Sequence, residues 1–379
     1  MALDWHPTEG RTALVNWDSV RDEVTQILQG LIRIDTTNPP GNEIQAARYL
    51  ADILAREGIE STISESAPGR GNVTARLRGG NANPPFMLLG HTDVVAVEPE
   101  KWSQPPFSGD LQEGCIWGRG ALDMKNMVAL ELVVFLLLHR QGTALNRDVI
   151  FAATADEEGG RGNHGIGWLL DNDPDQIDAA IILTEGGGHD VEVGSQRYYT
   201  CQVAQKGICR GRIISRGNPG HGSRPRAGSA TLTLSRAIAA LDGIELPIHP
   251  SRTMAAFIDG IAERQPADVA RALRGLLEPG EFQRALADLP LNMEFKGELR
   301  ALMGNTVAIT MLQAGSKINV IPGEATAFMD ARLAPGQTVD SFISELRPHV
   351  GDDVEIEIDQ YTEPIEMNAS GEFYETIKA

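Results

Sequence analysis

The chain contains 379 residues, of which 42% are hydrophobic and 22% charged, a composition typical of folded globular proteins. This length exceeds what one hydrophobic core usually supports, so we expect two domains. The formal net charge is −19, from 33 basic and 52 acidic residues. Because phosphate groups are bound by basic patches, this charge argues against nucleic acids and anionic membrane surfaces as partners.

Signals for export or membrane insertion are not expected in this sequence. The most apolar run, Met127–Leu138, contains Glu131 and is too short to span a bilayer. The start, Met1–His6, lacks the basic segment and apolar stretch of a signal peptide. The three cysteines are odd in number and form no Cys-x-x-Cys motif. We therefore expect a reducing, cytoplasmic location and a metal site, if any, made of His and carboxylates.

The first half of the chain alternates helical and strand patterns. Apolar residues at helical spacing predict helices over Asp18–Ile34, Glu43–Arg56 and Asn126–Arg140. Short apolar runs typical of buried strands lie at Asn72–Leu77, Phe86–Leu89, Val149–Ala153 and Ala179–Leu183. This alternation predicts an α/β fold, a three-layer domain with a mostly parallel central sheet.

After about Val193 the pattern changes to that of a smaller α+β domain. A long hairpin is expected over Tyr198–Ser215. Helices are expected at Ala230–Asp242, Ala267–Leu277, Phe282–Asp288 and Val339–Leu346, and strands at Thr306–Leu312, Ala325–Leu333 and Val354–Ile358. The second half therefore reads as a domain inserted into the first.

Four polar clusters lie where ligands of open α/β sheets collect, beyond the carboxyl ends of strands. Three of them directly follow a predicted strand, and the other opens the helix near Asn126. They are Gly90-His91-Thr92-Asp93, Gly118-Arg119-Gly120-Ala121-Leu122-Asp123-Met124-Lys125, Asp156-Glu157-Glu158 and Thr184-Glu185.

If these clusters converge, several carboxylates share one pocket. At a partly buried dielectric, each pair near 4 Å repels by about 4 kcal/mol, so protonation or divalent cations must compensate. One imidazole with several carboxylates suits zinc, and carboxylates can bridge two ions. Of the adjacent Glu157 and Glu158, one could bind metal while the other moves protons. Asp93, two residues from His91, could brace the free ring nitrogen of that histidine.

Together with further motifs, these clusters resemble the co-catalytic zinc family of aminoacylases, acetylornithine deacetylases, succinyl-diaminopimelate desuccinylases and glutamate-releasing carboxypeptidases. The resemblance runs from about residue 20 to about residue 360. The further motifs are Trp102 with Pro106-Phe107, Gly217-Asn218-Pro219-Gly220-His221-Gly222-Ser223, Asn319-Val320-Ile321-Pro322 and Asp330-Ala331-Arg332.

The resemblance implies a pair of zinc ions, for which Co²⁺ or Mn²⁺ could substitute. Asp123 would bridge the ions, His91 and Glu185 would complete one, and Glu158 would bind the other. The peptide bond between Asp123 and Met124 would be cis. In this family a histidine near the end of the chain completes the coordination of the second metal. The last histidine of this sequence is His349, within the predicted small domain, so fewer residues support the second metal than the first.

The resemblance also implies catalytic roles. Glu157 would be the general base and acid, activating a water bridged by the metals, and Asp93 would orient the histidine ligand. His221, from the partner subunit of a dimer, would stabilise the developing oxyanion. Asn319 and Arg332 would hold a substrate carboxylate.

The implied domains are a catalytic domain at 1–196, an inserted dimerisation or lid domain at 197–360, and the incomplete start of a returning catalytic segment at 361–379. We expect a metal-dependent hydrolase that cleaves an amide bond of an N-acyl amino acid or small peptide with a free carboxylate. The alternative is a non-catalytic small-molecule-binding or dimeric interaction relative without full metal binding. In that case Glu157-Glu158 would be a solvated acidic loop and Arg332 an ordinary strand arginine.

Overall fold

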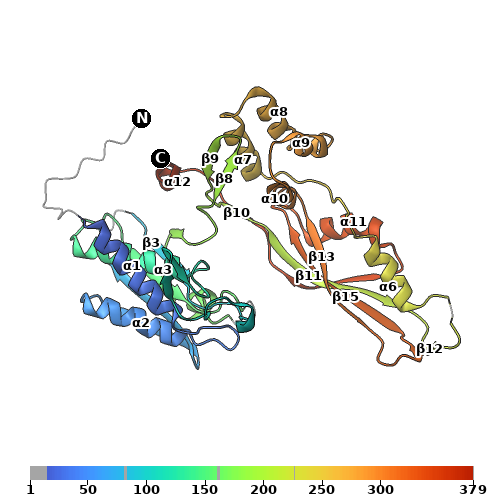
Figure 1. Cartoon of the computed structure of the whole chain (residues 1–379), viewed down its shortest axis with the longest axis horizontal. Coiled ribbons are helices and arrows are strands. Elements are labelled where there is room, and N and C mark those ends of the chain that lie inside the picture. The colour runs from blue at the N-terminus through green and yellow to red at the C-terminus, as the bar shows by residue number, and fades with distance from the viewer. Residues whose placement is uncertain (1–14, 81–82, 160–162, 226, 379) are drawn as a thin grey trace. The chain divides into compact units, whose positions relative to one another are not determined.

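A computed structural model describes residues 15–80, 83–159, 163–225 and 227–378. The chain divides into two compact units, Met1–Glu185 and Gly186–Ala379, and each is considered by itself (Figure 1). The segment Met1–His6, in which no export signal is expected, lies outside the described residues. Within the described ranges, no helix is long and apolar enough to cross a membrane.

The first unit contains a five-stranded mixed sheet with strand order β1-β2-β6-β3-β7. Its strands are β1 (Ser61–Ala67), β2 (Arg70–Leu77), β3 (Phe86–His91), β6 (Val149–Thr154) and β7 (Ile181–Leu183). The strand β3 runs parallel to both of its neighbours, β6 and β7. The strand β2 is antiparallel to β6, and β1 is antiparallel to β2. The central strands are therefore parallel, as predicted. The polar edge strand β1 was not predicted, because it buries only one side chain, that of Ser64.

Helices cover both faces of this sheet. The helices α1 (Trp17–Ile32), α2 (Glu43–Arg56) and α3 (Lys125–Arg140) share one core with Leu88 and Phe151, and α4 (Ile166–Asn172) and α5 (Pro174–Ile177) share the opposite core with Met87 and Ile150. Successive strand residues thus face opposite layers. The short elements η1 (Pro99–Lys101), β4 (Asp110–Gln112) and β5 (Cys115–Trp117) precede α3. The unit is the three-layer α/β structure that the alternation predicts.

The second unit contains a four-stranded antiparallel sheet with order β13-β15-β11-β16. Its strands are β11 (Gly207–Arg216), β13 (Thr306–Ala314), β15 (Glu324–Leu333) and β16 (Glu355–Tyr361). The helices α6 (Ala230–Ala239) and α11 (Val339–Val350) pack on one face, where Leu234 and Phe342 share a core with Ala327 and Met329. The short strands β12 (Gly220–His221) and β14 (Val320–Ile321) pair with each other.

A separate core in this unit corrects one prediction. It joins α7 (Arg252–Ala262), α8 (Ala267–Gly275), α9 (Phe282–Asp288) and α10 (Met293–Met303) to the hairpin of β8 (Asp190–Val193) and β9 (Gln196–Tyr199). The predicted hairpin over Tyr198–Ser215 is therefore wrong, because Tyr198 pairs with β8 while β11 pairs with β15 and β16. Alternation indicates a strand but does not specify its partner. Further along, β10 (Ala204–Gln205) pairs with β17 (Ile365–Glu366), and α12 spans Glu372–Lys378.

The carboxyl group of Glu131 in α3 yields a prediction about stability. Its side chain is buried, neither carboxylate oxygen has a hydrogen-bond partner, and burial raises its pKa from 4.5 to about 8. The unfolded chain releases this proton at lower pH than the folded chain does, so the group costs stability increasingly as pH rises from about 4.5 to about 8. We expect Glu131→Met to stabilise the protein by a few kcal/mol near pH 8 and by less near pH 4.5, measured by urea unfolding. Equal gains at both pH values would contradict this assignment.

Candidate active site

The predicted polar clusters meet at the carboxyl edge of the first unit's sheet. His91 ends β3, Glu157 and Glu158 lie in the turn after β6, and Glu185 lies two residues after β7. Asp123 belongs to the loop before α3, and the peptide bond that joins it to Met124 is cis, as expected. Because neighbouring parallel strands end at the same edge, these side chains lie close together.

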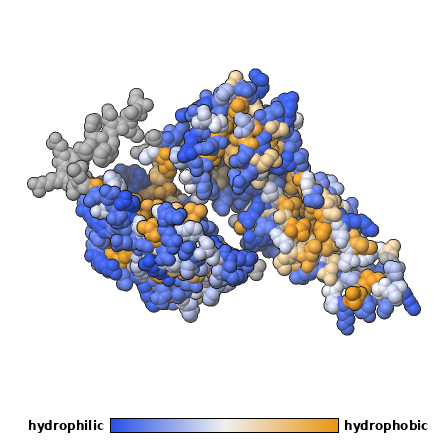
Figure 2. Space-filling model, viewed as in Figure 1, coloured by the Kyte–Doolittle hydropathy of each residue, from blue (hydrophilic) through white to orange (hydrophobic). Residues whose placement is uncertain are grey.

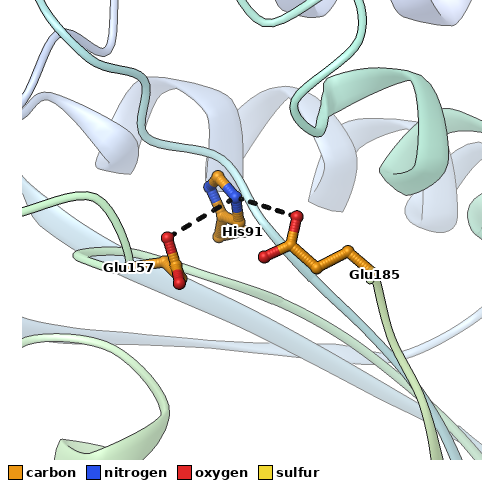
Figure 3. Close-up of side chains that lie close together, drawn as sticks. All are labelled: His91, Glu157 and Glu185. Carbon is orange, nitrogen blue, oxygen red and sulfur yellow. Dashed lines mark ion pairs between the residues drawn. The ribbon is translucent and has the colours of Figure 1, made fainter. Parts of the chain in front are cut away.

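The Nε2 atom of His91 faces three carboxylates. It lies 3.1 Å from Asp123 Oδ1. It also lies 3.6 Å from Glu185 Oε2 and 3.9 Å from Glu157 Oε2, the two carboxylates drawn in Figure 3. Ligand atoms lie within 4.8 Å of one another in two groups, His91 with Glu157 and Glu185, and His91 with Asp123 and Glu158. These groups contain every predicted metal ligand, together with the predicted base Glu157. One imidazole nitrogen surrounded by carboxylate oxygens is a donor set that suits zinc.

The charges of these residues fit a bound cation. Burial alone would lower the pKa of His91, but hydrogen bonds to Asp93 and Glu185 and their negative charges outweigh burial and raise it to about 11. Partial burial raises the pKa of Glu157 and of Glu158, and neighbouring carboxylates add to both shifts. The cluster therefore favours a positive charge at its centre, either a proton on the imidazole or a metal ion in its place.

Asp93 connects the histidine to the glutamate turn. It is completely buried, and its Oδ1 atom lies 3.4 Å from His91 Nδ1. Its two carboxylate oxygens accept the backbone N–H groups of Glu157 at 3.1 Å and Glu158 at 3.0 Å. Asn38 Nδ2 donates to the same carboxylate at 2.9 Å. The position of Asp93 beside His91 agrees with its expected role of orienting the histidine. The contact between Asp93 and Asn38 was not predicted from the sequence, although the Asn-Pro-Pro-Gly motif that begins at Asn38 is typical of a turn.

Lys125 is a second supporting residue that sequence reasoning missed. Its side chain is fully buried, and Nζ donates to the carbonyl oxygens of Leu31 at 3.0 Å and Ile34 at 2.8 Å, where α1 ends. Burial lowers its pKa to about 8. Its backbone N–H also donates to Gly120 O at 3.0 Å. Lys125 thereby ties the loop that carries Asp123 to the end of α1.

His221 and Asn319 lie together in the second unit. The strands β12 and β14 pair there, and the N–H of Gly222 donates to Asn319 O at 2.8 Å. His221 is exposed, and its Nδ1 atom accepts the N–H of Ser223 at 3.2 Å. Because Nδ1 is an acceptor, the proton of the neutral ring is on Nε2, which is free to donate to an oxyanion.

Arg332 lies at a different place in the same unit. It is close to the end of β15, where Nε donates to Asp330 Oδ1 at 2.9 Å. Asn319 precedes the other end of that strand, which begins at Glu324. Eight strand residues span roughly 26 Å, so Asn319 and Arg332 of one copy cannot hold the same carboxylate.

The buried position of Asp93 leads to a prediction for metal binding. Replacing Asp93 by Asn leaves one oxygen to accept two backbone N–H groups and places an amide beside His91. We expect Asp93→Asn to weaken zinc binding roughly 10- to 100-fold, measured by calorimetric titration of the metal-free protein. The matched control is Asp148→Asn, since Asp148 accepts the N–H of Gly79 at 2.9 Å elsewhere in this unit. Equal zinc affinities for the two variants would refute the role of Asp93.

Known proteins resemble this chain over most of its length. N-fatty-acyl-amino acid synthase/hydrolase PM20D1 of Xenopus tropicalis is 28% identical over 366 residues, which cover 92% of this chain and 69% of that protein. Its mouse counterpart is 31% identical over 294 residues, covering 76% of this chain and 57% of that protein. The chain thus spans little more than half of the mouse protein.

A solved structure shares the fold, and a family model matches the site. The M20 family metallo-carboxypeptidase of Sulfolobus solfataricus superimposes with a TM-score of 0.65 at 20% identity, covering 94% of this chain and 82% of that one. Residues 87–379 match the model of Peptidase family M20/M25/M40. This range contains His91 and the four carboxylates around it, and the resemblance to metal-dependent hydrolases that the motifs predict is confirmed. The chain belongs to peptidase family M20/M25/M40.

Proposed function

We propose that this chain hydrolyses the amide bond of an N-acyl amino acid or small peptide that carries a free carboxylate. The observation that carries the proposal is the ring of carboxylates around His91 Nε2. The names of its relatives agree with this substrate class, since they include an N-fatty-acyl-amino acid hydrolase and a probable succinyl-diaminopimelate desuccinylase of Staphylococcus aureus. The second of these is 25% identical over 363 residues.

The residues present would hold two divalent ions, with zinc as the proposed metal and Co²⁺ or Mn²⁺ as substitutes. Asp123 would bridge the ions, His91 and Glu185 would complete one, and Glu158 would bind the other. When bound, such ions supply Lewis acidity, which polarises a carbonyl group and makes water a stronger acid. A solved structure of the same fold, with a TM-score of 0.56, is that of a dinuclear metal binding peptidase of Bacillus subtilis.

Glu157 is the proposed general base and acid. Its carboxylate is about half exposed, 3.9 Å from His91 Nε2, so water and substrate can reach it. The shift of its pKa above 4.5, caused by partial burial and by Glu185 and Asp93, brings it closer to the pH at which a carboxylate accepts and returns a proton efficiently. Asp93 holds its backbone N–H while the side chain remains free to act.

A second copy of the chain would complete the site. We propose a homodimer formed through the inserted domain, residues 197–360, which brings His221 to the partner's oxyanion while Arg332 anchors the substrate carboxylate. The separation of Asn319, which precedes β15, from Arg332, near the end of that strand, supports contributions from two copies. The sheet edge β13 also exposes Met311 and Leu312 at 54% and 61%. Figure 2 shows apolar surface on this unit. An exposed apolar edge strand is a surface that another chain typically covers.

Two expectations complete the proposal. The proposed catalytic domain comprises residues 1–196, and residues 361–379 are the proposed start of a segment that returns to it. The compact units of the chain divide between Glu185 and Gly186. The proposed location is a reducing cytoplasm, which the free thiols of Cys115, Cys201 and Cys209 support.

Glu157→Gln tests the proposed reaction. We expect this variant to bind as much metal as the wild type, because Glu157 is not a proposed ligand, and to lose activity by roughly 100- to 10,000-fold. Metal content is measured by elemental analysis, and turnover is measured with a panel of N-acyl amino acids and dipeptides. A wild-type protein that binds these compounds without metal and without turnover would instead be the non-catalytic relative.

Subunit complementation tests the dimer. His221→Ala and Glu157→Gln are each expected to be inactive, yet a refolded mixture should regain about a quarter of wild-type activity, because random pairing makes half the dimers mixed and each has one intact site. Activity after mixing, compared with the unmixed variants, is the measurement. A mixture as inactive as its components, in a sample shown to be dimeric, would mean that His221 acts within its own copy or not at all.

A further inference from the structure

A buried cluster of charged and polar side chains lies next to the Glu157–Glu158 turn and has no role in the reaction described above. We name it the Arg70 clamp, and it consists of Asn38, Glu43, Arg70 and Asp156. Arg70 Nη2 donates to Glu43 Oε1 and to Asp156 Oδ1, both at 2.9 Å. Arg70 Nη1 donates to Asn38 Oδ1 at 3.3 Å. One guanidinium thus joins its own strand to two segments that are far apart in the sequence, the turn and helix start at residues 38–43 and the turn at Asp156.

The clamp is almost completely shielded from water. The side chains of Arg70, Glu43 and Asp156 are 9%, 0% and 3% exposed. Charges buried to this extent are costly unless they are paired in good geometry, so breaking the cluster is penalised. The turn at Gly41 packs directly against it, since a Cβ atom there would lie 2.6 Å from Arg70 Nε and 2.8 Å from Glu43 Oε2. With a φ of +84°, Gly41 meets both the steric and the backbone requirement of this turn.

The clamp contacts the candidate active site at two points. Asn38 Nδ2 donates at 2.9 Å to Asp156 Oδ1 and at 2.9 Å to Asp93 Oδ2. Asp93 in turn accepts the N–H groups of Glu157 and Glu158. An unbroken chain of hydrogen bonds therefore runs from Arg70 to the backbone of both glutamates.

Asp156 is the residue through which the clamp acts most directly. Its φ of +64° lies in the left-handed region, which is uncommon for residues other than glycine and persists where surrounding contacts impose it. Those contacts are Arg70 and Asn38 on Oδ1 and the N–H of His164, at 3.1 Å, on Oδ2. Since Glu157 follows Asp156 directly, the backbone of Asp156 determines the direction in which the turn presents its carboxylates.

We propose that the Arg70 clamp positions Glu157 and Glu158, so that Arg70 and Asn38 are positioning residues for the metal site and the proton-transferring carboxylate. They act through Asp156 and Asp93 and touch neither metal nor substrate. This inference rests on the proposed function for its effect on turnover, but not for its effect on the structure of the turn. A purely structural ion pair would stabilise the fold without any particular influence on these two glutamates.

The test compares Arg70→Met and Arg70→Lys with the control Arg76→Met. Arg76 lies on the same strand, β2, is 18% exposed, and pairs with Asp148 at 3.2 Å. We expect Arg70→Met to lower kcat or zinc affinity roughly 10- to 100-fold with KM for substrate little changed, as for other residues that support metal ligands. Arg70→Lys should recover only part of the loss, because an ammonium group does not reproduce the planar guanidinium fork. Arg76→Met should leave kcat and zinc affinity unchanged.

A second readout does not depend on activity. Hydrogen exchange of the metal-free protein should show faster exchange of the Glu157 and Glu158 amides in Arg70→Met and not in Arg76→Met. Should Arg70→Met fail to fold, Asn38→Ala removes the link to Asp93 while keeping the ion pairs, and the same acceleration is expected. Unchanged amide exchange together with unchanged kcat and zinc affinity in the folded variants would overturn the proposal that the clamp positions Glu157 and Glu158. A wild-type protein without metal binding or turnover would overturn the proposed function, while the exchange result would still decide the role of Arg70.

Discussion

Mutual repulsion among carboxylates is the constraint on which the candidate active site depends. Asp123, Glu157 and Glu185 each place an oxygen within 3.9 Å of His91 Nε2. Hydrogen bonds to Asp93 and Glu185 and the negative charges of these two residues outweigh burial and raise the pKa of His91 to about 11. Such a cluster needs a positive charge at its centre. A divalent ion satisfies this need better than one proton does, because it neutralises two carboxylates and is coordinated by several oxygens.

Holding these carboxylates in place requires buried supports behind them. Asp93 fixes both N–H groups of the glutamate turn, Lys125 ties the Asp123 loop to the end of α1, and Arg70 joins Glu43 to Asp156. Each support is a buried charged side chain held by two or more hydrogen bonds, so each tolerates little displacement. The carboxylate ligands are more exposed, as for Asp123 at 64%, which leaves them accessible to metal and substrate, whereas His91 is buried. The division between rigid support and accessible ligand is what makes the arrangement suitable for catalysis.

The supporting residues were harder to predict than the ligands. His91, Asp123, Glu158 and Glu185 lie in short motifs next to predicted strands, where topology alone brings them together. Arg70 carries no such signal, because it begins an ordinary strand and its partners Glu43 and Asp156 are 27 and 86 residues away. In the second unit, likewise, the alternation near Tyr198 indicated strands, but the contacts of β8 and β15 decided the pairing.

The sequence by itself determined the order of the three long helices and the four apolar strands of the first unit, the edge of the sheet at which the site forms and the family to which the chain belongs. These follow from local periodicity and from motifs a few residues long, which act over one element. Only the tertiary structure decided that Asp93 binds the turn of Glu157, that Arg70 reaches Asp156, and that Asn319 precedes the start of β15 while Arg332 lies near its end. The reason is physical, since burial and hydrogen bonding between distant segments depend on how the elements pack, which local pattern does not encode.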